Sequence, residues 1–274
     1  MTEAQHEIWA QGGAYEQYVG RWSRRVAEPF LASLAMPPSL RWLDVGCGTG
    51  ALAAALLEGA KPQAVFAVEP SPGFLAQARE RLQGRVSLMP GSATNIPLPD
   101  ASVDIAVSGL VLNFVPNLAE GLAEMRRVVQ PGGSIAAYVW DYAEGMELMR
   151  HFWDAAVSLD DAARALDEGV RFPLCQPAAL RAAFEQAGMA AVQVAPITVA
   201  TRFKDFDDYW APFLGGQGPA PAYACSLDAT ARDALRESVR ARLPVQADGE
   251  IALRARAWAV HGRTPPKAAA AAGV

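Results

Sequence analysis

Apolar residues between positions 40 and 140 gather in short continuous runs that alternate with stretches of helical spacing. Almost wholly apolar runs of this length are typical of strands buried on both faces of a parallel sheet. The pattern predicts strands at Arg41–Val45, Ala64–Val68, Val86–Met89, Val103–Ser108 and Ser134–Val139. Between them it predicts helices at Thr49–Glu58, Pro72–Leu82 and Leu118–Val129, the last closed by Pro131-Gly132-Gly133.

The second half of the chain is less regular. Its pattern predicts helices at Gly145–Leu159, Pro177–Ala187 and Leu227–Leu243, and strands at Ala190–Phe203 and Glu250–His261. An aromatic-rich segment, Phe206–Leu214, is followed by a Gly- and Pro-rich stretch, 215–221, which is typical of a loop. At the other end of the chain, Ala14–Ala35 has helical spacing that is broken near Gly20 and Pro29.

This alternation predicts an α/β fold, with a doubly wound, Rossmann-like sheet of seven strands in which only the last is antiparallel. We expect a single domain over residues 1–264, with N-terminal helices in residues 1–38. Residues 142–175 and 204–248 are expected to be helical insertions that cap the carboxyl edge of the sheet. The Ala-rich residues 265–274 are expected to be a disordered tail.

The most informative stretch runs from Trp42 to Gly50, where an apolar strand with an acid, Asp44, leads into three glycines separated by small residues. Because glycine has no Cβ, such a turn before a helix lets another molecule approach the backbone closely. The acid before the turn would repel a pyrophosphate but suits the amine of an amino acid. The turn therefore favours S-adenosylmethionine over a dinucleotide as its ligand.

Further segments follow this turn in a fixed order. Glu69 ends the second strand, where an acid can accept hydrogen bonds from ribose hydroxyls. Gly91–Thr94 follows the third strand, Ser108–Pro116 continues from the end of the fourth, and Val129–Gly133 precedes the fifth. In series these segments resemble class I S-adenosylmethionine-dependent methyltransferases of the small-molecule type, the methyltransferase type 11 group. The resemblance runs from Tyr15 to Val139.

The resemblance implies a cofactor site with defined roles. Gly46 and Gly48 would pass beneath the methionine part of S-adenosyl-L-methionine, and Asp44 would orient the turn. Residues 1–38 would cover the cofactor. Glu69 would bind the ribose, and Pro70, Ser92 and Ala93 would contact the adenine. Backbone groups of Ser108 and Leu110 would bind the methionine amine. Tyr18 and Arg21 would belong to a segment that closes over the cofactor, with Arg21 paired to the methionine carboxylate.

The function implied is methyl transfer to a small-molecule acceptor, on oxygen or carbon, by an enzyme. No motif in the sequence identifies a catalytic residue. A carbon acid or phenol would need a general base, for which the candidates are Asn113, Asp141, His151 and Tyr209. Asn113 stands where many relatives have His. A carboxylate acceptor would need no base, and the low Lys and His content makes a carboxylate or enolate acceptor the preferred expectation.

Two alternatives stay open. Gly46, Gly48 and Ala51 also satisfy a loose dinucleotide pattern, so an NAD(P)-dependent oxidoreductase is the second hypothesis. The absence of a Tyr-x-x-x-Lys pair weakens it. The third is a regulator that binds the cofactor without catalysis, which an intact cofactor site alone does not exclude.

The composition of the chain limits which kinds of binding partner and which cellular location we expect. The net charge of −5 disfavours a nucleic-acid surface, and no apolar stretch approaches the roughly 20 residues of a membrane span. Three cysteines and three histidines at distant positions give neither a disulfide framework nor a metal site. We therefore expect a cytoplasmic protein, monomeric or homodimeric, without a metal ion.

Overall fold

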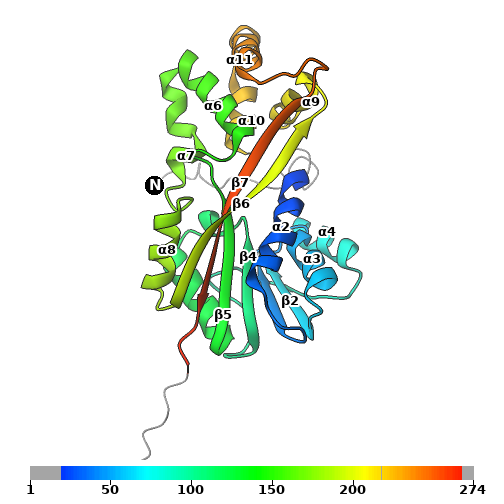
Figure 1. Ribbon diagram of the computed structural model, residues 1–274, viewed down its shortest axis with the longest axis vertical. Coiled ribbons are helices and arrows are strands. Elements are labelled where there is room, and N and C mark those ends of the chain that lie inside the picture. The colour runs from blue at the N-terminus through cyan, green and yellow to red at the C-terminus, as the bar shows by residue number, and fades with distance from the viewer. Residues whose placement is uncertain (1–19, 217, 267–274) are drawn as a thin grey trace, which may run out of the picture. The chain divides into compact units, whose positions relative to one another are not determined.

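The computed structural model describes residues 20–216 and 218–266, which divide into two compact units (Figure 1). The first, called here the sheet unit, holds residues 27–139, 177–195 and 259–266. The second, called the helical unit, holds residues 20–26, 140–176 and 196–258. The residues of both expected insertions lie in the helical unit. The single domain over 1–264 and the capping role of the insertions stay predictions.

A seven-stranded mixed sheet is the framework, as predicted, with its last strand antiparallel and helices flanking it. The strand order is β3-β2-β1-β4-β5-β7-β6. The strands are β1 (Arg41–Val45), β2 (Ala64–Glu69), β3 (Ser87–Pro90), β4 (Val103–Gly109), β5 (Val129–Trp140), β6 (Ala190–Phe203) and β7 (Ile251–Arg263).

The interior strand β1 forms parallel ladders with β2 on one side and β4 on the other. Trp42, for example, lies opposite Val65 in β2 and Ile105 in β4, and all three side chains are buried. At the start of β4, Asp104 accepts hydrogen bonds from the Arg41 backbone amide at 2.7 Å and from its guanidinium at 2.8 Å. All these strands end at one edge, where the polar residues of the motifs collect.

Helices of the sheet unit begin where the sequence supplies caps. In α4 (Pro72–Leu82) the Ser71 hydroxyl accepts from the Phe74 amide, and Pro72 takes the first position, which needs no N–H donor. The helix α2 (Arg21–Leu34) begins in the helical unit and contains Pro29 in its interior. The other helical segments of the sheet unit are α3 (Ala51–Gly59), α5 (Leu118–Val128), α8 (Pro177–Gln186) and the short 3₁₀ turn η2 (Leu112–Phe114).

One expectation about the sheet is wrong. Pro131-Gly132-Gly133 does not separate a helix from a later strand, because β5 begins at Val129 and runs through these residues. The ladder with β4 is irregular there, passing from Val129 opposite Val103 to Ser134 opposite Ile105. Gly133 permits this bulge, since a Cβ on it would lie 2.6 Å from the Asp104 carbonyl oxygen.

The helical unit contains more helix than its sequence pattern predicts. Pro219 and Pro221, expected in a loop, lie in the first turn of α10, a position that proline tolerates. The 3₁₀ segment η3 and the helix α7 were also not expected. The helices and 3₁₀ segments are α6 (Glu147–Leu159), η3 (Asp161–Leu166), α7 (Glu168–Arg171), α9 (Phe206–Trp210), η4 (Ala211–Leu214), α10 (Pro219–Ser226) and α11 (Ala229–Arg242).

An aromatic cluster forms the core of the helical unit. Phe152 of α6 is fully buried and stacks on Phe213 with ring centroids 4.4 Å apart. Trp153 meets Phe152 edge-on. Trp210 stacks on Phe152 and also on Phe206. The aromatic-rich segment of the sequence is therefore core of this unit.

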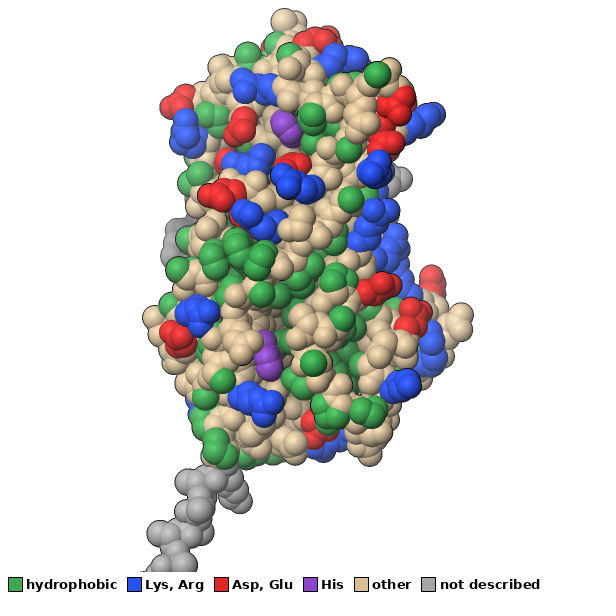
Figure 2. Space-filling view, in the orientation of Figure 1, with side chains coloured by type: hydrophobic (Ala, Val, Ile, Leu, Met, Phe, Trp, Pro, Cys, Tyr) green, Lys and Arg blue, Asp and Glu red, His purple; other side chains and the backbone are tan. Residues whose placement is uncertain are grey.

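The surface carries both signs of charge. Figure 2 shows basic and acidic side chains next to one another on the visible face. Ion pairs within the helical unit include Arg254 with Glu147 at 3.0 Å and Arg256 with Glu144 at 3.2 Å. None of the helices in the described part of the chain has the length and hydrophobicity that crossing a membrane requires.

Replacing Phe152 by Ala should lower the free energy of unfolding by about 3–5 kcal/mol, because it leaves a cavity in the aromatic cluster. Leu159→Ala, on the same helix but 54% exposed, should change it by less than about 0.5 kcal/mol. Urea denaturation followed by circular dichroism measures both. Equal effects of the two substitutions would contradict the assignment of Phe152 to the core.

Candidate cofactor site

The turn after β1 depends on glycine at three positions. Gly46, Gly48 and Gly50 have φ of +73°, +53° and +85°, which side chains with a Cβ rarely adopt. A Cβ on Gly46 would also lie 2.6 Å from Cγ1 of Val111, so the segment after β4 packs directly against the turn. The amides of Gly46 and Cys47 both donate to the Val68 carbonyl of β2, at 2.9 and 3.0 Å.

Glu69, at the end of β2, holds the turn with its side chain. Its Oε2 accepts from the Gly48 amide at 3.0 Å, and its Oε1 accepts from the Ser71 amide at 2.9 Å. The side chain is only 6% exposed, and burial raises the pKa of the carboxyl, while the Ser71 and Gly48 amides oppose that shift. Because a carboxylate oxygen can accept more than one hydrogen bond, each keeps capacity for a further donor.

Asp44, one residue before the end of β1, is a buried acid without a partner. It is 1% exposed, and neither carboxylate oxygen accepts a hydrogen bond from the described residues. Burial raises its pKa to about 7; the backbone of Ala53 opposes the shift and the charge of Glu69 adds to it. Buried unpartnered polar groups are rare and call for an explanation. An ammonium group on a bound molecule would supply the missing donors.

The loop after β3 carries Ser92 and Ala93. Ser92 and Asn95 bond to each other through their backbones, and the Ser92 hydroxyl lies 3.2 Å from that of Thr94. The Gly91 amide donates to the Glu69 carbonyl, which keeps this loop beside the end of β2. Ala93 is buried, whereas Pro70, the residue after Glu69, is exposed.

At the end of β4, Ser108 and Leu110 are tied to the sheet. The buried Ser108 hydroxyl donates to the Val45 carbonyl at 2.9 Å. Leu110 has φ of +63°, a strained value for a leucine, and its amide donates to the Tyr138 carbonyl at 2.8 Å. Only the carbonyl side of Leu110 therefore remains to receive an ammonium.

The sheet unit thus brings eight of the eleven expected cofactor residues to consecutive strand ends, with Pro70 beside them: Asp44, Gly46, Gly48, Glu69, Ser92, Ala93, Ser108 and Leu110. Two expected residues lie elsewhere. Tyr18 is outside the described residues, and Arg21 belongs to the helical unit.

Arg21 already has partners within its own unit. Its Nη1 donates to Asp208 at 3.0 Å, and its guanidinium lies over the rings of Trp22 and Phe203, 4.4 and 4.7 Å from their centroids. Its Nε and Nη2 are buried without a hydrogen-bond partner. This is the edge of the guanidinium that can bind a carboxylate in bidentate fashion. Its pairing with the cofactor stays a prediction.

The four candidate bases differ in what surrounds them. Asp141 accepts from the Arg256 guanidinium at 2.6 Å and from the Glu144 amide at 3.1 Å. Tyr209 donates to the Leu148 carbonyl at 2.7 Å, and burial raises its pKa well above the ordinary value. Both are therefore engaged in holding the helical unit together, so neither is carried into the proposals below.

His151 and Asn113 remain. Burial lowers the pKa of the half-buried His151, with Glu147 and Asp154 raising it and Arg242 lowering it further. Asn113 lies in η2, after β4, and both polar atoms of its side chain are buried without a partner among the described residues.

The contact of Val111 with Gly46 was not predicted, because nothing in the residue type of Val111 signals it.

Comparison with known proteins places these strand ends in a family. Residues 43–137 match the family model described as a methyltransferase domain. Residues 43–137 form a methyltransferase domain of the class I S-adenosylmethionine-dependent type. The matched segment holds Asp44, the glycine turn and Glu69.

Two curated methyltransferases illustrate the similarity. The malonyl-[acyl-carrier protein] O-methyltransferase of Serratia marcescens is 39% identical over 112 residues, covering 41% of this chain and 43% of the relative. The ubiquinone/menaquinone biosynthesis C-methyltransferase UbiE of Methylobacterium nodulans is 30% identical over 169 residues, covering 56% and 66%. Each match covers less than two thirds of the relative's length.

Two solved structures illustrate the similarity of the fold. The YcgJ protein of Bacillus subtilis superposes with a TM-score of 0.59 at 16% identity, covering 89% of this chain and 99% of that one. Phosphoethanolamine N-methyltransferase 2 of Haemonchus contortus, solved with S-adenosyl-L-methionine, superposes with a TM-score of 0.57 at 17% identity, covering 93% and 56%. At these identities the likeness shows the fold alone.

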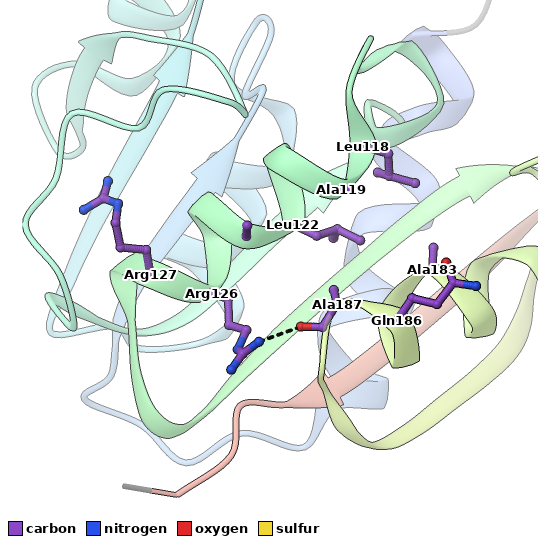
Figure 3. A pocket seen from close by; sticks show the side chains of 9 residues that line it. Leu118, Ala119, Leu122, Arg126, Arg127, Ala183, Gln186 and Ala187 are labelled. Carbon is purple, nitrogen blue, oxygen red and sulfur yellow. Dashed lines mark hydrogen bonds between the residues drawn. The ribbon is translucent and has the colours of Figure 1, made fainter.

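A separate groove of the sheet unit lies between α5 and α8 (Figure 3). It has a volume of about 760 Å³, and Leu118, Leu122 and Ala183 are among the residues that line it. Arg126 donates across it to the Ala187 carbonyl at 2.9 Å, and Arg127 is held by Glu124 and Asp100. Since both guanidinium groups have protein partners, we assign no ligand to this groove.

The raised pKa of Asp44 predicts a pH dependence of stability. An aspartate in an unfolded chain titrates near pH 3.9, so between about pH 4 and 7 the folded protein holds a proton that the unfolded chain has released. The free energy of unfolding should therefore fall as pH rises through this window, by about 1.4 kcal/mol per pH unit for this group. Glu69, whose pKa is also raised, acts in the same direction.

Asp44→Asn should remove its part of this slope and should be more stable than the unmodified protein at pH 8 by a few kcal/mol. Urea denaturation at pH 5, 6, 7 and 8 measures the difference, and Asp233→Asn at an exposed position is the control. If the Asp44→Asn curve ran parallel to that of the unmodified protein, Asp44 would not be a buried, proton-holding acid.

Proposed function

We propose that this protein transfers the methyl group of S-adenosyl-L-methionine to a small-molecule acceptor, on oxygen or carbon. One observation carries the proposal: a buried carboxylate with two unpartnered oxygens, that of Asp44, immediately precedes a glycine turn at a strand end. An amino-acid ammonium group would satisfy those oxygens, and the turn would let the rest of the ligand approach the backbone. Bound S-adenosylmethionine supplies an electrophilic methyl group on a sulfonium.

In this proposal, different residues of the sheet unit contact different parts of the cofactor. Asp44 and the Leu110 carbonyl receive the methionine ammonium, and Gly46 and Gly48 pass beneath the methionine. Glu69 accepts from the ribose hydroxyls with the lone pairs that Gly48 and Ser71 leave free. The adenine contacts are assigned to Pro70, Ser92 and Ala93, the backbone of Ser108 assists at the amine, and Tyr18 and Arg21 are assigned to the closing segment.

Catalysis then rests on alignment. The protein holds acceptor, methyl group and sulfur in line and excludes water, and such positioning is worth up to about 7–11 kcal/mol in favourable cases. The acceptor is left open between oxygen and carbon because the similar proteins include one named as an O-methyltransferase and one named as a C-methyltransferase. We expect a soluble cytoplasmic enzyme, monomeric or homodimeric, that binds no nucleic acid.

Two other functions have less support. A nicotinamide-dependent oxidoreductase would place a pyrophosphate at the turn, next to the buried acids Asp44 and Glu69, where its charge is unfavourable. A regulator without catalysis would keep the same cofactor residues. Such a regulator would differ from the proposed methyltransferase only in that it transfers no methyl group.

Turnover is tested by incubating the protein with S-adenosylmethionine labelled in the methyl group and a panel of carboxylates, phenols and quinols. The proposal expects labelled product and stoichiometric S-adenosylhomocysteine with at least one acceptor. Tight binding of S-adenosylhomocysteine with no transfer to any acceptor would favour the regulator instead.

Replacing Glu69 by Ala should weaken the binding of S-adenosylhomocysteine by roughly 1.5–3 kcal/mol, the scale of hydrogen bonds to a charged group. Glu69→Gln should lose less, because its amide still offers one acceptor oxygen. Isothermal titration calorimetry gives the affinities, with Glu58→Ala on an exposed position of α3 as the control. Unchanged affinity in Glu69→Ala would remove this residue from the ribose contact.

A further inference from the structure

Asn113 carries a buried amide without a partner among residues 20–216 and 218–266. Neither its Oδ1 nor its Nδ2 forms a hydrogen bond with any of these residues. Asparagine in a short turn commonly bonds to the nearby backbone, but here the turn closes without it: the amides of Phe114 and Val115 donate to the carbonyls of Val111 and Leu112. Leaving a buried polar group unpartnered is costly, because the group loses its hydrogen bonds to water. A role in folding therefore does not account for this side chain.

The position of Asn113 points to a ligand. It lies in η2, just beyond the carboxyl end of β4, the edge at which open α/β sheets bind their ligands. Val111, two residues earlier, packs directly on Gly46 of the glycine turn. Leu110, the residue before Val111, holds a strained φ of +63°, a feature that clusters at functional sites. The unpartnered amide therefore belongs to the same strand-end region as the cofactor turn.

The chemistry of an amide limits what it can do there. Its Nδ2 donates two hydrogen bonds and its Oδ1 accepts, and neither atom takes up a proton near neutral pH. Such a group can orient an oxygen acceptor, but it cannot remove a proton from a carbon acid or a phenol. An acceptor that is already an anion needs no such removal, and a carboxylate oxygen accepts hydrogen bonds only, which suits Nδ2.

We propose that Asn113 binds the methyl acceptor through Nδ2, and that this acceptor is a carboxylate methylated on oxygen without a general base. The proposal rests on the methyl transfer proposed above and names its acceptor class. A lone pair of the carboxylate oxygen forms the new oxygen–carbon bond, and the electrons of the broken carbon–sulfur bond stay on sulfur. The negative charge of the carboxylate and the positive charge of the sulfonium cancel, and no proton moves. Asn113 is then a specificity-determining residue.

The test uses the full chain in its complex with S-adenosylhomocysteine. Calorimetry measures binding of malonyl-coenzyme A, trans-aconitate and benzoate as carboxylate probes, with acetyl-coenzyme A as the probe that lacks the free carboxylate. Menadiol is the probe for carbon methylation. Methyl transfer to each probe is measured in parallel between pH 6.5 and 9. The variants are Asn113→Ala, the isosteric Asn113→Asp and, as a control amide, the exposed Gln63→Ala.

We expect at least one carboxylate probe to bind and to be methylated, with kcat/KM independent of pH across this range. Asn113→Ala should weaken binding of that probe tenfold or more, and Asn113→Asp should weaken it further because two like charges meet. In both variants the affinity for S-adenosylhomocysteine should stay near that of Gln63→Ala. The melting temperature of Asn113→Ala should be no lower than that of Gln63→Ala, because the substitution removes an unpartnered buried amide.

Other outcomes separate the two proposals. Methylation of menadiol but of no carboxylate, a kcat/KM that rises tenfold per pH unit, or full carboxylate binding by Asn113→Asp would each overturn the role of Asn113. A protein that binds S-adenosylhomocysteine but none of the carboxylate probes would overturn it as well. A protein that binds no S-adenosylhomocysteine would overturn the proposed function itself.

Discussion

The carboxylate of Glu69 is the constraint on which the cofactor site depends. It ties the Gly48 amide of the glycine turn to the Ser71 amide at the start of α4. The Val68 carbonyl adds two more bonds, from Gly46 and Cys47, so the ends of β1 and β2 are fixed to each other through the turn. Because the turn needs positive φ at three glycines, its shape is set before any ligand arrives.

The second acid of the site is in the opposite situation. Glu69 accepts hydrogen bonds from two backbone amides, whereas neither oxygen of Asp44 accepts one of ordinary geometry from the described residues. Asp44 is the more deeply buried of the two, and only the backbone of Ala53 opposes the rise of its pKa. Burial is the main cause of the pKa of about 7 for Asp44, and the charge of the neighbouring Glu69 adds to it. A positively charged ligand relieves the cost of ionising Asp44. We therefore expect the strand ends to favour an ammonium over a phosphate, in agreement with the methyltransferase-domain match of residues 43–137.

A helix or strand could be predicted from the sequence where its bounds depend on neighbouring residues in the chain, and not where they depend on residues that are distant in sequence. The bounds of β1, α4 and β6 follow from the apolar pattern and its Gly and Pro boundaries, and they agree with the structure. The early start of β5 could not be predicted, because it depends on a bulge at Gly133 against a neighbouring strand. Likewise α10 begins with prolines that usually indicate a loop.

Candidate site residues divide in the same way. Asp44 and Glu69 occupy the expected strand ends, since the pattern fixes where those strands stop. Asp141 and Tyr209 were attractive as bases by residue type, but their partners, Arg256 and the Leu148 carbonyl, lie far away in the chain and no local pattern reveals them. The unpartnered amide of Asn113 is visible only once the structure shows that nothing around it bonds to it.

The central claim is that the strand ends of the sheet unit bind a sulfur nucleotide and not a dinucleotide. Isothermal titration of the purified protein with S-adenosylmethionine, S-adenosylhomocysteine and NADH tests it most directly. The account predicts binding of the two sulfur nucleotides with 1:1 stoichiometry and no binding of NADH. Binding of NADH alone would contradict it, because a pyrophosphate would then occupy a turn flanked by two buried acids.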